Sequence, residues 1–389
     1  MIFAASSIYQ VSVAGLSPLQ LVLVGTVLEL SILLFEVPTG IVADMYSRRL
    51  SIIIGYVLIG VGFLLEGSLP FFLPIILGQI LWGIGYTFTS GATQAWISDE
   101  IGEVRANRAF LRANQLGQAT ALLGLGAGAL IGSLRVSLPI QVGGGLILAL
   151  AVVLAFLMPE NGFQPAPRKE RHTWQVFRAT FTDGIAAIRR RPALLDILLI
   201  GLFFGLYSEG FDRLWTKLIL DNFTFPALFQ PVVWLSGLRA AGMMVSIAAT
   251  EVASRRTDTT NHISIARALM GITIVLIAGL IGFAQARWLI GLVAAYWIIY
   301  VSRNLINPLY TAWVNQKLDS TVRATVLSMS SLVDAIGQVA GGPLIGLIGN
   351  LSGVRVAISI SSLSLTPILL LFNHTLRRLP ESTSTNLDA

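Results

Sequence analysis

The chain has 389 residues, of which 54% are hydrophobic and only 12% are charged, and its mean hydropathy is +0.76. A soluble protein carries about 25% charged residues, so this composition excludes an ordinary soluble domain and indicates a membrane protein. The chain has no cysteine, which excludes disulfides and thiol catalysis, and its three histidines lack metal-ligand spacing. No nucleotide-binding loop or nucleophile triad occurs in the sequence, so we expect neither an enzyme nor a bound cofactor.

Long apolar runs fill most of the chain. A helix needs about 20 apolar residues to cross a bilayer, and proline and glycine recur inside these runs, as they do in transmembrane helices. The sequence therefore predicts an all-α, multi-pass protein of the lipid bilayer. After a short first run, eleven runs cover residues 19–41, 50–69, 72–97, 108–132, 139–158, 194–218, 228–253, 265–283, 288–313, 324–348 and 354–375.

The first run is too short to cross a membrane. Residues 1–14 provide a helix of roughly 21 Å at 1.5 Å per residue. A signal peptide would need a basic start and a small-residue cleavage site, which the run lacks. We interpret it as the outer part of a truncated first span, and we expect an in-frame upstream extension that encodes one or two basic residues and about six more apolar ones.

The longest hydrophilic stretch lies in the middle of the chain. Residues 159–193 are rich in Pro, Gly, Arg and Lys, which is typical of a cytoplasmic linker with an interfacial helix near anionic lipid. A regulatory or partner-docking role is the alternative. The stretch divides an N-terminal half, residues 1–158, from a C-terminal half, residues 194–375, and residues 376–389 form a disordered polar tail.

Basic residues predict the orientation. If the loop that holds Arg48 and Arg49 is cytoplasmic, then alternate loops, their helix ends and the tail hold 19 of the 26 basic residues. This asymmetry is the positive-inside signal. The net charge of +6 therefore reflects topology and does not indicate nucleic-acid binding. We expect both termini on the cytoplasmic side of a plasma membrane, such as a bacterial inner membrane.

A charged motif separates the second and third spans. It reads Gly40-Ile-Val-Ala-Asp44-Met-Tyr-Ser-Arg48-Arg49, and a degraded copy, Glu251-Val-Ala-Ser-Arg255-Arg256, follows 207 residues after Asp44. The G-x-x-x-D-x-x-x-R-R pattern resembles the corresponding loop of major facilitator superfamily transporters. The preceding segment Phe35–Gly40 resembles the drug-efflux, proton-antiporter branch of that family.

The resemblance implies a twelve-span bundle of two pseudo-symmetric six-helix halves and a gating role for the motif and its copy. Asp44 is expected to cap the N-terminus of a helix of the other half, near residues 321–325. Arg48 and Arg49 are expected to pair with acids after the fourth span, such as Asp99 or Glu100. The alternative is that these charges only set the topology. The gating residues are therefore Gly40, Asp44, Arg48, Arg49, Asp99, Glu251, Arg255 and Arg256.

The two halves repeat in detail. Ala95-Trp96 ends the fourth span, and Ala312-Trp313 ends the tenth, 217 residues later. The same offset pairs two polar stripes at helical spacing, which indicates that they face a shared interior. The candidate substrate residues on these stripes are Tyr86 and Ser90 of the N-terminal half, and Arg303 and Asn307 of the C-terminal half.

Charged residues inside spans are costly and usually face a bundle interior. Arg303 lies near the middle of the tenth span, Asp334 in the eleventh and Arg239 in the eighth. One interpretation is that Asp334 pairs with one of the two arginines and holds the C-terminal half together. The other is that these residues bind substrate or couple transport to an ion.

Charged residues at two further places each allow two interpretations. Glu29 lies deep in the second span with no basic residue in the spans of its half, so it is a candidate proton carrier; the alternative is a glutamic acid satisfied by hydrogen bonds within the helix. The second set lies on the seventh span, where intrahelical pairing accounts for the charges and an outer gate is the alternative. Its members are Glu209, Asp212, Arg213 and Lys217.

The resemblance weakens in two places. The fifth-span antiporter pattern G-x-x-x-G-P-x-x-G-G has Ala129 for its Pro and Ser133 for its last Gly, and Gln79 replaces an Arg of many efflux relatives. We expect a monomeric secondary active transporter that works by alternating access and is driven by a proton gradient to export small amphipathic compounds. The alternatives are a metabolite or organic-anion importer or uniporter, and a non-transporting membrane sensor or scaffold.

Overall fold

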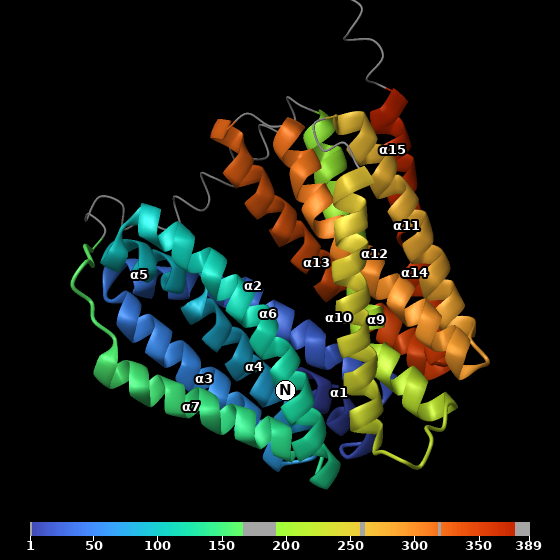
Figure 1. Ribbon diagram of the computed structural model, residues 1–389, viewed down its shortest axis with the longest axis horizontal. Helices are drawn as coiled ribbons and strands as arrows, with labels where there is room; N and C mark the ends of the chain where they lie inside the picture. The colour runs from blue at the N-terminus through green and yellow to red at the C-terminus, as the bar shows by residue number, and fades with distance from the viewer. Residues whose placement is uncertain (1, 166–191, 257–260, 318–319, 378–389) are drawn as a thin grey trace, which may run out of the picture. The chain divides into compact units, whose positions relative to one another are not determined.

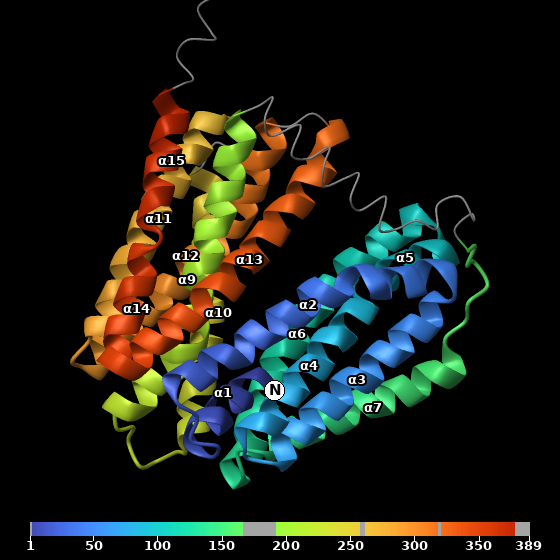
Figure 2. The same ribbon diagram turned by 180° about the vertical axis from the view of Figure 1, so that it is seen from behind.

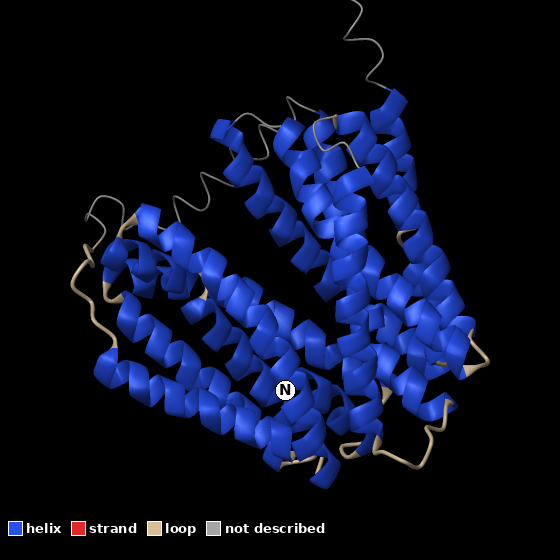
Figure 3. Ribbon diagram, viewed as in Figure 1, coloured by secondary structure: helices blue, strands red, loops and turns tan. Residues whose placement is uncertain are grey.

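The computed structural model describes residues 2–165, 192–256, 261–317 and 320–377, and in these residues the only regular structure is helical (Figures 1 and 3). The predicted basic linker and tail lie largely outside the described residues. The helices are α1 (Ile2–Ser12), α2 (Pro18–Met45), α3 (Arg48–Ser68), α4 (Phe72–Thr89), α5 (Ala92–Ile101), α6 (Glu103–Leu134), α7 (Leu138–Leu157), α9 (Pro192–Asn222), α10 (Pro231–Arg256), α11 (His262–Gln285), α12 (Leu289–Lys317), α13 (Ser320–Ser352), α14 (Val354–Leu363) and α15 (Thr366–Arg377).

Eleven helical segments of the described chain are long and apolar enough to cross a membrane. They coincide with the eleven apolar runs, and the short α1 precedes them, so the prediction of eleven long spans after a short first helix is confirmed. Hydropathy was sufficient because a run of about 20 predominantly apolar residues is recognisable from the sequence alone.

Two spans that the sequence predicted as continuous are each made of two helices. The fourth span breaks between α4 and α5 at Gly91, whose φ of 69° lies in the left-handed region, where glycine lacks the steric penalty of other residues. The last span breaks between α14 and α15 at Ser364 and Leu365. Gly91 lies 217 residues before Pro308, which is inside the unbroken α12, so both repeats place a helix-disrupting residue at the same position.

The chain divides into two compact units, Met1–Ala179 with Ile219–Gly237, and Thr180–Leu218 with Leu238–Ala389. In the first unit, α3 packs against both α4 and α7, and α2 packs on α4 (Figures 1 and 2). The backbones of these helices nearly touch: a Cβ on Gly55 would lie 2.6 Å from the Gly85 carbonyl oxygen, and one on Gly144 would lie 2.9 Å from that of Gly60. Small residues therefore set the helix spacing here.

In the second unit, α11 packs against α12, α14 and α15 (Figure 2). Large aromatic side chains fill its core; Trp313 is fully buried, and its ring centre lies 5.6 Å from that of Phe372. The α9 and α13 helices cross closely, because a Cβ on Gly341 would lie 2.8 Å from the Leu206 carbonyl oxygen. This close crossing positions the pocket described next.

Candidate functional site

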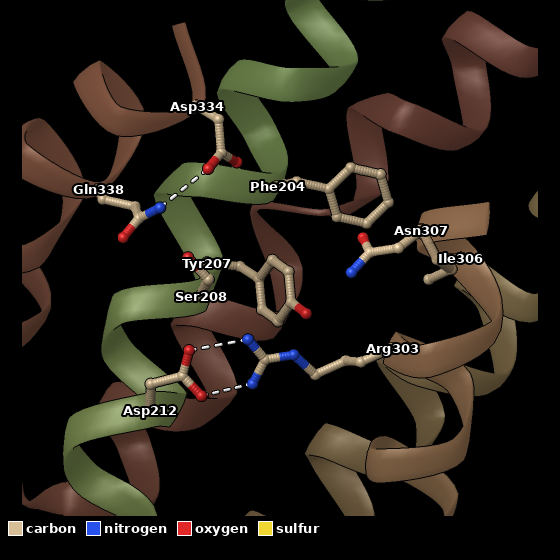
Figure 4. Close-up of a pocket in the computed structure, with 9 residues that line it drawn as sticks. All are labelled: Phe204, Tyr207, Ser208, Asp212, Arg303, Ile306, Asn307, Asp334 and Gln338. Atoms are coloured by element: carbon tan, nitrogen blue, oxygen red, sulfur yellow. Dashed lines mark hydrogen bonds and ion pairs between the residues drawn. The ribbon is translucent and has the colours of Figure 1, made fainter. Parts of the chain in front are cut away.

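A polar pocket of about 230 Å³ lies within the second unit, where α9, α12 and α13 face one another (Figure 4). Seven of the nine lining side chains are polar, which is unusual inside a membrane span. The lining residues are Phe204, Tyr207, Ser208, Asp212, Arg303, Ile306, Asn307, Asp334 and Gln338.

An ion pair joins α12 to α9 across this pocket. Both terminal nitrogens of Arg303 donate to the Asp212 carboxylate, with Nη2 2.7 Å from Oδ2. The guanidinium group also lies 5.8 Å from the ring centre of Tyr207 and 5.9 Å from that of Phe211. The fork geometry fixes the orientation of the arginine and neutralises its charge.

Asp212 corrects an expectation from the sequence. Intrahelical pairing was expected for the seventh-span cluster, and Glu209 does pair with Arg213 at 2.8 Å. Asp212 instead turns to Arg303, because consecutive helical residues point about 100° apart, and it faces the pocket rather than its helical neighbours. From the sequence, Asp212 was named as a member of the seventh-span cluster but was not included among the substrate candidates. The sequence feature that could have identified Asp212 is that it is a second acid inside a span of the half that contains Arg303.

Asp334 is held differently from the expected arginine pair. Its carboxylate accepts a hydrogen bond of 2.8 Å from Gln338 Nε2, one turn along α13. Arg303 pairs with Asp212, while the Arg239 guanidinium lies 4.9 Å from the ring centre of Trp215. Within the described residues, then, Asp334 is a pocket carboxylate that forms no ion pair.

The other substrate and coupling candidates divide between the units. Asn307 lines the pocket. Tyr86, which is 48% exposed, and Ser90 belong to the first unit, at and just before the break in the fourth span. Glu29 is half-buried on α2, and it is not a residue without interaction partners.

The gating motif lies at the α2–α3 junction. Arg48 forms an ion pair with Asp99 of α5 and lies 5.9 Å from the Phe163 ring centre. Arg49 donates from its side chain to the Ala155 carbonyl oxygen. Arg48 and Asp99 belong to the same unit, so their pair does not itself link the two halves.

Glu160, which the sequence analysis did not single out, caps this junction. Its Oε1 accepts from the backbone N–H of Arg49 at 2.9 Å, and its Oε2 accepts from the Ser47 hydroxyl at 2.6 Å. A carboxylate at a helix N-terminus meets unpaired N–H groups and the positive end of the helix dipole. The segment after α7 is therefore fastened to the start of α3. The signal in the sequence was an acid just beyond the sixth span.

The remaining motif residues are placed as follows. Gly40 lies inside α2, and Asp44 is exposed in its last turn. The expected partner helix of Asp44, near residues 321–325, belongs to the second unit, and its side chains lie outside the described residues. Glu251 pairs with Arg255 at 2.7 Å on the exposed end of α10, and the Arg256 side chain is likewise outside the described part.

Comparisons with known proteins agree with this architecture. The family model described as Major Facilitator Superfamily matches residues 1–301. The protein described as "Uncharacterized MFS-type transporter YxaM" from Bacillus subtilis (strain 168) is 22% identical over 360 residues, which are 90% of this chain and 86% of that protein.

Solved transporter structures share the fold. The nucleoside transporter NupG aligns with a TM-score of 0.71 and 13% identity over 96% of this chain and 97% of its own. An inward-facing, occupied bacterial homologue of the human lysosomal transporter Spinster aligns with a TM-score of 0.71 and 12% identity, over 97% and 93%. A POT family transporter in complex with 5-aminolevulinic acid gives 0.68 and 12%, over 97% and 93%.

Proposed function

The chain belongs to the major facilitator superfamily of membrane transporters, and we propose that it is a proton-coupled secondary transporter of a small, polar, neutral or cationic solute. The pocket around Arg303 and Asp212 contacts the solute in the second unit. Transport proceeds by alternating access, in which ligands shift the balance between conformations.

The ion pair between Arg303 and Asp212 determines which solute charge the pocket accepts. Arg303 already donates to both carboxylate oxygens of Asp212, so a substrate carboxylate would have to displace an intramolecular partner. Asp334 adds a second acid to the lining, and among the described residues Arg303 is the one basic residue that lines the pocket. The formal charge of the lining is therefore zero or negative, which opposes an organic anion and accepts a neutral or cationic solute.

The side chains also favour a solute with several hydrogen-bonding groups. The lining includes the amides of Asn307 and Gln338 and the hydroxyl groups of Tyr207 and Ser208, which offer a solute both donors and acceptors. The Phe204 ring adds a surface for stacking. That fold neighbours carry nucleosides and peptides agrees with a polar cargo without identifying it. Efflux of amphipathic compounds is the second candidate, which the aromatic side chains of the pocket favour.

Coupling to protons is assigned to Asp334. It lies in the pocket, where solute and proton can reach the same carboxylate, and Gln338 can donate to it or accept from it after a half-turn of its amide. Because no cation is paired with it in the described residues, protonation neutralises the carboxylate without freeing an arginine.

The test is uptake into proteoliposomes, with and without an inward or outward pH gradient, of a neutral nucleoside, a zwitterionic dipeptide, a dicarboxylate and a cationic amphiphile. We expect pH-driven transport of a polar neutral or cationic compound and none of the dicarboxylate. Asp334→Asn should still exchange that substrate across the membrane but should no longer concentrate it, because binding survives and proton linkage does not.

The matched control is Glu103→Gln, which removes an exposed acid from the first turn of α6. It should keep driven uptake. Transport of the dicarboxylate alone would contradict the proposed solute class, and driven uptake by Asp334→Asn at the wild-type level would contradict its coupling role. The melting temperature of Asp334→Asn should stay near that of the wild type, since no ion pair is broken.

A further inference from the structure

A second carboxylate is buried in the first unit, away from the pocket. Glu66, near the end of α3, has 0% exposure. Its Oε1 accepts from the Ser6 hydroxyl and, at 2.8 Å, from Gln10 Nε2, both on α1. Its Oε2 accepts from Gln79 Nε2 of α4 at 2.9 Å. Three helices thus converge on one carboxylate through uncharged donors.

The fold itself does not need a carboxylate at this position. Residues 217 positions apart correspond in the two halves. With this offset, the end of α3 corresponds to the end of α11, and the start of α4 corresponds to the start of α12. With the same offset, Glu66 corresponds to Phe283 and Gln79 corresponds to Tyr296. Those two side chains are buried, and their ring centres lie 6.5 Å apart. The second unit therefore packs the same two helices with aromatic rings, whereas burial of an acid costs free energy.

The amide of Gln79 leaves one atom unused. Its side chain is only 2% exposed, and its Oε1 is buried without a hydrogen-bond partner. Such atoms are uncommon in folded proteins and call for an explanation. A half-turn of the terminal amide exchanges its NH₂ group with this oxygen, so that Oε1 comes to face Oε2 of Glu66. An acceptor in that position fits a protonated carboxyl group.

We propose that Glu66 is a reversible proton-binding site in the first unit, held by Ser6, Gln10 and Gln79. In the ionised state the Gln79 amide donates to Oε2. In the protonated state a proton from hydronium bonds to Oε2, one water molecule is released, and the turned Gln79 oxygen accepts from the new O–H group. Ser6 and Gln10 donate to Oε1 in both states, so the carboxyl group stays in place while its charge changes.

Charged and titratable groups lie on the elements that pack around Glu66. The phenol of Tyr9 on α1 interacts electrostatically with both Glu66 and Arg135. Two helices, α4 and α7, pack most extensively on α3, and neither contains Asp, Glu, Lys or Arg. The α2 helix contains Glu29, Glu36 and Asp44. Proton binding at Glu66 does not depend on transport. Its contribution to coupling rests on the proton-driven function proposed above.

The test is infrared difference spectroscopy of the purified protein in lipid nanodiscs as the pH is stepped downward. A protonated carboxyl group has a carbonyl stretch that a carboxylate lacks. We expect the wild type to show one component of this band, the Glu66 band, that is lost in Glu66→Gln, is retained in Asp334→Asn and shifts in Gln79→Leu, which has no acceptor for the O–H group. Glu36→Gln, an exposed acid on α2, is the control and should leave the band unchanged.

A spectrum from which no component is lost in Glu66→Gln, or a Glu66 band that does not move in Gln79→Leu, overturns the proposal. If Glu66→Gln yields no monodisperse protein, the position of the band in Gln79→Leu decides the question alone. Uptake measurements separate the two proposals. The absence of a Glu66 band with pH-driven uptake intact refutes the proton site only, whereas the absence of driven uptake with the band present refutes proton coupling only.

Discussion

Asp212→Asn removes the charge that neutralises Arg303 while keeping the shape of the side chain. The carboxylate accepts from both terminal nitrogens of the guanidinium group. An asparagine offers one acceptor, and its NH₂ group faces an N–H donor. The arginine then keeps its full charge beside the rings of Tyr207 and Phe211. We expect the second unit to lose stability, since an unpaired intramembrane charge is unfavourable.

The size of the loss follows from exposure. Removing one partner of a fully buried pair costs about 3–5 kcal/mol, whereas exposed pairs contribute about 0.2–1 kcal/mol. The Arg303 and Asp212 side chains are 31% and 41% exposed, which places the pair between these limits. We expect a destabilisation of about 2 kcal/mol, or a melting temperature lower by about 4–8 °C for a unit of this size.

The assay is a double-mutant cycle of Asp212→Asn and Arg303→Gln, followed by thermal unfolding in nanodiscs. The double variant should lose less stability than the sum of the single variants, by about 1–2 kcal/mol, because no charge is left unpaired. The control cycle uses Glu251 and Arg255, an exposed pair at 62% and 76%, where coupling should stay below about 0.5 kcal/mol. Additive effects at Asp212 and Arg303 would refute the reasoning.

Three further predictions concern the first unit. Arg48→Ala should slow transport at unchanged yield and monodispersity, because it frees Asp99 of α5 from the start of α3; wild-type turnover per molecule would contradict this. Glu160→Gln should lower stability by about 0.5–1 kcal/mol through the loss of charge at a helix N-terminus, and an unchanged melting temperature would exclude a capping role. Gly91→Ala should cost about 1–2 kcal/mol because φ there is 69° and an L-residue is strained in that region. Gly117→Ala, also in open space but within α6, is its control and should not destabilise.

The sequence was sufficient for the spans and insufficient for the partners of their charged residues. A run of apolar residues specifies a membrane helix by itself, and the i, i+4 rule gave the Glu209–Arg213 pair. The partner of Asp212 is 91 residues away on another helix, and the sequence does not show which face of α9 meets α12. Local spacing therefore assigned the wrong partner.

The burial of Glu66 also depends on residues that are distant in the sequence. It lies two residues before the end of α3, where an acid is expected to reach the membrane surface. Its burial depends on Ser6 and Gln10 of the short α1, which are 60 and 56 residues away. The break at Gly91 was also missed, because glycine occurs within many unbroken membrane helices and only the backbone conformation distinguishes the two cases.

The close packing of α3 limits how the first unit can deform. Where Gly55 meets Gly85 and Gly60 meets Gly144, a carbonyl oxygen lies against the neighbouring main chain, and the side chains of Thr89 and Leu148 fill the space beside it. Any axial shift of α3 past α4 or α7 would bring a carbonyl oxygen against a neighbouring main chain, so α3, α4 and α7 must move as one body. Bending during transport is then confined to positions outside this contact. Within the described fourth span, that position is Gly91, whose left-handed backbone separates α4 from α5. Variation at the glycine contacts should therefore be nearly forbidden even though none of them touches a solute.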